Sequence, residues 1–203
     1  MRIISGKLKG LKLKQIKNVK IRPTKNLAKE GIFNFLEKKI LLKQKKILEL
    51  FCGSGNISYE FASRGVKFIF CVDNNTHCIK YIKKTIKQLN LENNIFFKKK
   101  DVFSFLKKKS DISYDIIFSD PPYKISFKEI FILIKRIIKY KWIKKNGLII
   151  IESSKENSKK IIFVFKKNFC FKQLKYGNTY FSILVLKNYL NNLNYLNNLN
   201  YLL

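Results

Sequence analysis

The central part of the chain alternates between short apolar runs and longer amphipathic stretches. A run such as residues 47–51 is rich in β-branched and aromatic side chains, which predicts a buried strand. A stretch such as residues 76–89 carries apolar residues three or four positions apart, which predicts a helix with one buried face. By the same criteria, strands are expected over residues 47–51, 67–73, 95–99, 114–119 and 147–152, and helices over 57–63, 76–89, 102–108 and 127–140.

This alternation of strand and helix is typical of a parallel sheet with helices on both faces and right-handed crossovers. Two further apolar runs, residues 169–176 and 179–186, are joined by Gly177 and Asn178 and predict an antiparallel hairpin. We therefore expect an α/β fold of the Rossmann-like type, with a mostly parallel, seven-stranded sheet that the C-terminal hairpin closes.

Segments at both ends of the chain depart from the alternation. Residues 2–17 alternate loosely around Gly6 and Gly10 and predict a short basic hairpin, and a helix is expected after Thr24, its N-cap. The end of the chain repeats Tyr-Leu-Asn-Asn-Leu-Asn, which predicts a disordered or frayed tail. Three parts are expected: an N-terminal hairpin and helix (residues 1–42), the main domain (43–188) and the tail (189–203).

The charge of the chain indicates a polyanionic partner. There are 43 Lys and Arg against 13 Asp and Glu, a formal net charge of +30, and nucleic acid has the phosphates that such a surface neutralises. Lys, Ile, Asn and Phe are over-used together, so A- and T-rich coding accounts for part of the excess. With this charge, the N-terminal hairpin and helix are interpreted as an RNA-binding appendage.

Other features of the sequence bear on metal binding and on the location of the protein. The four cysteines form no C-x-x-C pair and have no histidine cluster near them, so no metal is expected. The start of the chain has no apolar signal core, and no run of about 18 uncharged residues appears. We expect a cytoplasmic protein without a membrane span, acting as a monomer.

A glycine-rich loop follows the first predicted strand. Glycine there lets the backbone approach a ligand, and the helix N-terminus after it offers N–H groups. Asp73 ends the second strand about 20 residues further on, where nucleotide-binding folds place an acid on the ribose. Asp101 ends the third strand and could take the edge of an adenine together with the N–H of Val102. One such acid alone is better explained as a helix cap or a solvated loop end, but acids at successive strand ends together with the loop favour a nucleoside site. The expected cofactor contacts are Glu49, Gly53, Ser54, Gly55, Asp73, Asn74, Asp101 and Val102.

The sequence Asp120-Pro121-Pro122-Tyr123 directly follows the fourth predicted strand. Each proline fixes its own φ and keeps the residue before it extended, so the carbonyls of Asp120 and Pro121 are held rigidly. Tyr123 offers a flat face beside them. This loop is suited to hold a planar, amine-bearing group while its nitrogen reacts.

In this order, the glycine loop, Asp73, Asp101 and the Asp120–Tyr123 motif resemble the S-adenosylmethionine-dependent amino-methyltransferases. Ile57 and Ser58 stand where the dinucleotide fingerprint has its third glycine, which argues against NAD.

The front of the chain is similar to one family among these enzymes, the bacterial 16S ribosomal RNA guanine-N2 methyltransferase D family. The similar segments are residues 2–7, Gly10, residues 22–24 and residues 30–34, and the resemblance extends over nearly the whole chain to Leu186. Leu27 stands near the position where this family usually has a second arginine.

The resemblance implies methyl transfer from S-adenosylmethionine to the exocyclic N2 amine of one guanine in 16S ribosomal RNA, within the assembled or assembling small subunit. The catalytic residues would be Asp120, Pro121 and Tyr123: two acceptors that orient the amine and a ring that stacks on a flipped-out base. Asp120 would also take the released proton. The expected substrate contacts are Pro122, Tyr123, Arg2, Lys7, Lys9, Lys12 and Arg22, the basic residues binding phosphates.

Two alternatives remain open at the level of the sequence. The first is an adenine-N6 methyltransferase acting on RNA or DNA, because Asp-Pro-Pro-Tyr also serves that amine. The chain has no inserted domain large enough to read DNA sequence, which argues against the DNA form. The second is a non-catalytic RNA-binding protein of ribosome assembly; the intact Gly53, Gly55, Asp73 and Asp120 argue against it.

Overall fold

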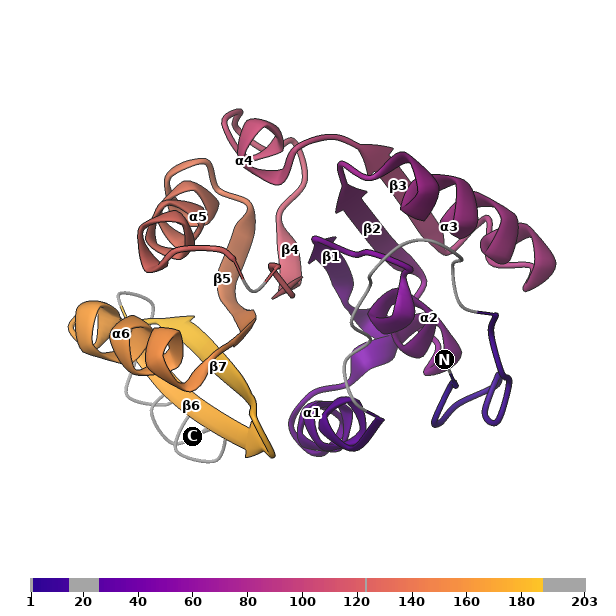
Figure 1. The fold of residues 1–203 in the computed structure, drawn as a ribbon, viewed down its shortest axis with the longest axis horizontal. Coiled ribbons are helices and arrows are strands. Elements are labelled where there is room, and N and C mark those ends of the chain that lie inside the picture. Colours follow the sequence, from indigo (N-terminus) through magenta and orange to yellow (C-terminus); the bar gives the residue numbers. More distant parts are fainter. Residues whose placement is uncertain (1, 15–25, 123, 188–203) are drawn as a thin grey trace. The chain divides into compact units, whose positions relative to one another are not determined.

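The computed structural model describes residues 2–14, 26–122 and 124–187 (Figure 1). The chain divides into two compact units, Met1–Phe105 and Leu106–Leu203, and each is described by itself. Several predictions concern residues outside the described ranges: the Thr24 cap, Arg22, Tyr123 and the tail over residues 189–203.

The first unit is built on three parallel strands. Its elements are α1 (Asn26–Lys39), η1 (Leu42–Gln44), β1 (Lys46–Leu50), α2 (Asn56–Ser63), β2 (Phe68–Asp73), α3 (Thr76–Gln88), β3 (Ile95–Lys99) and α4 (Val102–Phe105). β2 lies between β1 and β3, with Glu49 opposite Cys71 and Asp73 opposite Lys99. The predicted strands and helices of this part are confirmed to within a few residues, α4 being shorter than expected.

Local sequence explains why these elements form. Ile47, Leu48 and Leu50 of β1 are fully buried, as expected for a strand covered on both faces. Helix α3, which lies along β3 in Figure 1, begins where the Asn75 side chain accepts hydrogen bonds from the N–H groups of His77 (2.9 Å) and Cys78. This is an N-cap, which satisfies donors that a helix leaves unpaired.

The predicted N-terminal hairpin is present and packs on the end of α2. Arg2 and Lys12 form an antiparallel bridge, and the Ile3 N–H donates to the Leu11 carbonyl at 3.0 Å. Gly6 has a φ of 81°, and a Cβ there would lie 1.9 Å from the carbonyl oxygen of Ser63. Only glycine therefore fits at this contact.

A buried ionic cluster fixes the hairpin and α1 to α2. The Lys29 ammonium donates to the Glu60 carboxylate and to the Asn56 side chain, each at 2.9 Å, and to the Arg2 carbonyl at 2.7 Å. The Glu60 carboxylate also accepts hydrogen bonds from the backbone N–H groups of Ile4 and Ser5, at 3.1 Å. The side chains of Lys29 and Glu60 are both fully buried.

The charges in this cluster compensate one another. Burial alone would raise the pKa of Glu60, but hydrogen bonds from Arg64 and Lys29 lower it below its usual value. Burial lowers the pKa of Lys29, and Glu60 opposes that shift. Arg64 also pairs with Glu37 at 3.1 Å and lies over the Phe33 ring. A network satisfied in this way is costly to break at any one member.

The second unit combines parallel and antiparallel pairing. Its elements are β4 (Tyr114–Ser119), α5 (Phe127–Lys139), β5 (Ile143–Ser153), α6 (Lys155–Phe165), β6 (Phe169–Tyr176) and β7 (Thr179–Leu186). β4 and β5 are parallel, whereas β7 is antiparallel to both β5 and β6, which confirms the predicted hairpin. Sequence analysis missed α6, although Ser154 caps it and the Ser158 hydroxyl meets that of Ser182 on β7 at 2.8 Å.

The strands are ordered β3-β2-β1 in the first unit and β4-β5-β7-β6 in the second. This confirms the predicted Rossmann-like α/β class with a mostly parallel sheet and a C-terminal antiparallel hairpin. Within the described residues, no helix is both long enough and apolar enough to cross a membrane. The expected division after residue 42 stays a prediction; the hairpin and α1 lie in the same compact unit as β1, β2 and β3.

Candidate functional site

The loop between β1 and α2 is tightly curled. Phe51, Gly53 and Gly55 all have positive φ, at 58°, 52° and 77°. This left-handed region suits glycine but is uncommon for phenylalanine, so the loop holds a strained residue where a ligand is expected. The Gly55 N–H donates to the Cys52 carbonyl at 2.8 Å, and α2 begins at the next residue.

Asp73 ties this loop to the end of β2. One carboxylate oxygen accepts the Gly53 N–H at 2.8 Å, and the other accepts the Asn75 N–H, also at 2.8 Å. Each oxygen of an ionised carboxylate has two lone pairs, so both keep acceptor capacity for ribose hydroxyls. Asn74, the neighbouring predicted contact, is exposed.

Asp101 caps the short helix α4. One of its carboxylate oxygens accepts the Ser104 N–H at 2.8 Å, which is the helix-cap role that the sequence left open. Asp101 is exposed and Val102 is buried. The ring of Phe103 stands edge-on to that of Phe51, with centroids 6.1 Å apart. An adenine contact by Asp101 and Val102 stays a prediction.

Glu49 lies behind the loop, in the interior of the first unit. It is only 2% exposed, and its carboxylate accepts a hydrogen bond from the Ser58 hydroxyl on α2. Burial raises the pKa of Glu49 to about 8, against the opposing influence of the Ser58 hydrogen bond. The group is therefore mostly protonated at neutral pH. A direct contact between Glu49 and a cofactor stays a prediction.

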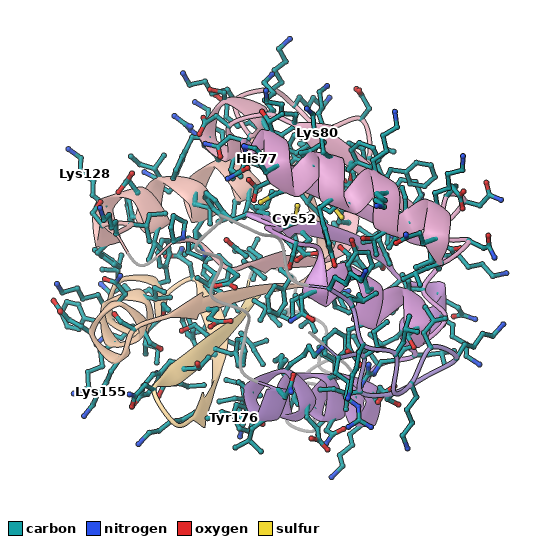
Figure 2. The ribbon with its side chains drawn as sticks, turned by 45° about the vertical axis from the view of Figure 1, so that its right-hand side comes forward. Cys52, His77, Lys80, Lys128, Lys155 and Tyr176 are labelled. Atoms are coloured by element: carbon teal, nitrogen blue, oxygen red, sulfur yellow. The ribbon has the colours of Figure 1, made fainter. Side chains whose placement is uncertain are left out.

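Side chains around Glu49 belong to the same interior layer. The Ser58 hydroxyl lies 2.9 Å from the Cys71 sulfur, and Cys52 and Cys71 are both buried free thiols. Figure 2 labels Cys52 among these interior groups and His77 at the start of α3. His77 is exposed.

In the second unit, β4 runs into the two-proline turn. Asp120 is half-buried, Pro121 is buried and Pro122 is exposed. The turn is closed by the Ile125 N–H, which donates to the Pro122 carbonyl at 2.9 Å. The Ser126 capping box then starts α5.

A hollow in the second unit lies beside this turn. It is lined by Asp120, Pro121, Pro122, Ile125, Glu152, Ser153, Ser154 and Asn157. The last four come from the end of β5 and the start of α6, and sequence analysis did not select them. The signal that could have identified Glu152 is an acid at the carboxyl end of the fifth strand, the position that Asp73 and Asp120 occupy on theirs.

The predicted phosphate-binding residues Arg2, Lys7, Lys9 and Lys12 are all exposed on the N-terminal hairpin. Leu27, near the position where the resembled family has an arginine, is 69% exposed on α1. Within the described ranges, no group of three or more His, Cys, Asp or Glu side chains is arranged to hold a metal ion.

Comparisons with known proteins agree with this fold and these motifs. The family model described as "Conserved hypothetical protein 95" matches residues 1–185. The "Ribosomal RNA small subunit methyltransferase D" of Buchnera aphidicola from Acyrthosiphon pisum is 38% identical over 161 residues, covering 77% of this chain and 79% of the relative. The protein of the same name from Buchnera aphidicola of Baizongia pistaciae is 34% identical over 161 residues, covering 79% of this chain and 80% of the relative.

Among solved structures, the Escherichia coli protein yhhF has a TM-score of 0.76 at 23% identity and covers 92% of this chain and 97% of its own. That likeness confirms the class I methyltransferase fold, and the family model matches nearly the whole described chain. This chain belongs to the Conserved hypothetical protein 95 family, the family of the ribosomal RNA small subunit methyltransferase D proteins.

Proposed function

We propose that this protein transfers a methyl group from S-adenosylmethionine to the exocyclic N2 amine of a guanine in 16S ribosomal RNA of the small subunit. Membership of the family supports methyl transfer to small-subunit ribosomal RNA, which is the activity that its relatives' names state. The observation that carries the nitrogen chemistry is the turn after β4, where a carboxylate and two prolines border a hollow.

The first unit supplies residues that fit the methyl donor. Gly53 and Gly55 allow a ligand to approach the backbone closely at the start of α2. Asp73 lies at the end of β2, the strand next to β1. When bound, S-adenosylmethionine supplies an electrophilic methyl group on a sulfonium centre. Asp73 would accept hydrogen bonds from the ribose hydroxyls, and the loop N–H groups would face the polar end of the ligand.

The second unit supplies residues that fit the methyl acceptor. The lone pair of a guanine amine is delocalised into the ring, so the nitrogen needs orientation to react. The Asp120 carboxylate and the Pro121 carbonyl would accept the amine hydrogens and aim the lone pair at the methyl group. Asp120 would then take the proton that the methylated nitrogen releases. Stacking of Tyr123 on the base is part of the proposal.

The hairpin cations extend the proposal to the RNA. Arg2, Lys7, Lys9 and Lys12 stand exposed on one short hairpin, where they would contact successive phosphates. Such contacts position RNA without reading its sequence. The choice of guanine therefore has to come from the pocket around Asp120.

The test is methyl transfer in vitro with purified protein, labelled S-adenosylmethionine and small subunits from cells that lack the gene. The 16S RNA is digested to nucleosides after the reaction, and the labelled product is identified. We expect N2-methylguanosine. Labelled N6-methyladenosine would favour the adenine alternative, whereas absence of both transfer and S-adenosylmethionine binding by calorimetry would favour a non-catalytic assembly protein.

A further inference from the structure

The hollow beside Asp120 contains a second carboxylate. β4 and β5 are parallel, with Ser119 opposite Ile151; Glu152 is the next residue on β5, and Asp120 directly follows the end of β4. Partners in a parallel pair point to the same face, and neighbouring strands lie about 4.8 Å apart. Both residues line the hollow, so two carboxylates border the same small space.

Glu152 is held in place by its surroundings. It is 9% exposed and pairs with Phe181 on β7, within the antiparallel ladder. The start of α6 follows at once, where the Ser154 hydroxyl accepts the Asn157 N–H at 3.2 Å. A buried carboxylate needs hydrogen-bond donors, and its two oxygens offer about four lone-pair sites.

The two purines differ at the atom next to the amine. In guanine, N1 carries a hydrogen beside the N2 amine, so this edge presents adjacent donors. In adenine, N1 is an unprotonated acceptor beside the N6 amine. A site that offers two neighbouring acceptors matches the guanine edge and opposes the adenine edge, because a carboxylate would then face a nitrogen lone pair.

We propose that Glu152 selects guanine by accepting its N1–H, while Asp120 and the Pro121 carbonyl hold the N2 amine. This inference rests on the proposed function and assigns the choice of base to one residue. Glu152 is a specificity-determining residue that contacts the base at N1. Glu152 forms and breaks no covalent bond. In the methyl transfer the bond between N2 and the methyl carbon forms, and the bond between that carbon and the sulfonium sulfur breaks.

The experiment exchanges a charged carboxylate, both oxygens of which accept hydrogen bonds, for a neutral amide with one acceptor and one donor group, and measures base preference. Glu152→Gln keeps the size of the side chain and adds an amide N–H₂. Guanosine and 2-aminopurine riboside are compared as inhibitors of transfer to unmethylated small subunits. Both nucleosides carry the 2-amine, but N1 of 2-aminopurine has no hydrogen.

For the wild-type protein, guanosine should inhibit at concentrations about tenfold or more below those of 2-aminopurine riboside. In Glu152→Gln this ratio should fall by about tenfold, and kcat/KM on small subunits should fall by about 10- to 100-fold. Affinity for S-adenosylmethionine, measured by calorimetry, should be unchanged. That combination separates base selection from a general loss of structure.

Glu156→Gln is the matched control. It removes the same charge four residues away, but Glu156 is 76% exposed and pairs only on the surface of α6, with Lys160. It should leave the nucleoside ratio and kcat/KM as in the wild type.

Two results would overturn the inference: a wild-type protein that does not prefer guanosine, or a Glu152→Gln variant with the wild-type ratio. The first measurement needs no variant. If the wild type produces no N2-methylguanosine, the proposed function fails; if it does and the ratio is insensitive to Glu152, only the role of Glu152 fails.

Discussion

At the scale of the residue, the proposed function gives Asp120 two separable roles. As an acceptor it would orient the amine, and as a base it would take a proton. Asp120→Ala removes both roles and should lower kcat by about 10² to 10³-fold. Asp120→Asn keeps a carbonyl acceptor, so its loss should be smaller. Single-turnover methyl transfer to small subunits measures the loss for both variants. Their affinity for S-adenosylmethionine shows whether the loop between β1 and α2 is intact.

Asp115→Asn is the control for these variants. Asp115 lies on the same strand and pairs with Lys144 at 2.8 Å, away from the two-proline turn. Its kcat should match the wild type. Equal activity of Asp120→Ala and wild type would contradict the assigned chemistry.

Glu49 makes the stability of the fold depend on pH. Its pKa is about 8 in the folded protein, against 4.5 for the ordinary carboxyl group. Between these values the folded state binds more protons than the unfolded state, so this contribution falls as pH rises from about 4.5 to about 8. The slope reaches about 1.4 kcal/mol per pH unit at most.

Glu49→Gln resembles the protonated acid and should remove this contribution. Urea unfolding from pH 5 to pH 8 measures it as the difference between variant and wild type. Parallel curves for the two proteins would show that Glu49 is ionised in the folded state.

Residues of the site differ in how far sequence could identify them. Asp120 is followed by two prolines, and Asp73 ends a strand about 20 residues after a glycine-rich loop, so sequence patterns mark both. Glu152 also ends a strand but has no motif beside it, and its place in the hollow gives that position its meaning. Lys29 and Glu60 were missed because single charges within a helix resemble solvated surface residues.

At the scale of the element, the Lys29–Glu60 pair holds α1 and the hairpin on α2. Lys29→Met would leave Glu60 buried without one of its cations, which should cost about 3–5 kcal/mol in the free energy of unfolding. Denaturant titration measures this loss. Lys160→Met, which breaks an exposed pair on α6, should leave the unfolding midpoint unchanged. Similar midpoints for the two variants would refute a structural role of the buried pair.

The hairpin offers a sharper comparison between two glycines. Gly6 and Gly10 have φ of 81° and 86°, but a Cβ would meet the Ser63 carbonyl only at Gly6 and nothing within 4 Å at Gly10. Gly10→Ala should cost about 1–2 kcal/mol of backbone strain. Gly6→Ala should cost more, because the hairpin must also move off α2. Unfolding midpoints rank the two, and the reverse order would contradict the packing of the hairpin.

Element boundaries followed from sequence where apolar periodicity was strong. β1 to β5 and the C-terminal hairpin were predicted because their apolar runs are local signals. Helix α6 was missed because its first turns are polar, and only Ser158, Ile161 and Phe165 are buried. The start of β5 at Ile143 was also missed, since its first residues are lysines and Asn146 with positive φ.

At the scale of the whole molecule, the formal net charge of +30 is much larger than the few cations of the N-terminal hairpin contribute. Figure 2 labels Lys80, Lys128 and Lys155 on α3, α5 and α6, three separate helices, and all three are exposed. Lysines spread over many elements fit the over-use of A- and T-rich codons as well as RNA binding. The hairpin is therefore expected to position the RNA and the pocket to choose the base, while the general charge raises the rate of encounter.

Methylation of a guanine amine in small-subunit RNA is tested most directly by mass mapping of 16S RNA. The RNA is taken from cells with and without this gene, and from cells that carry the Asp120→Ala form. We predict that a single guanine loses its methyl group when the gene is absent, and that the wild-type gene restores it whereas Asp120→Ala does not. An unchanged map, or the loss of a methyl group from an adenine instead, would contradict the account.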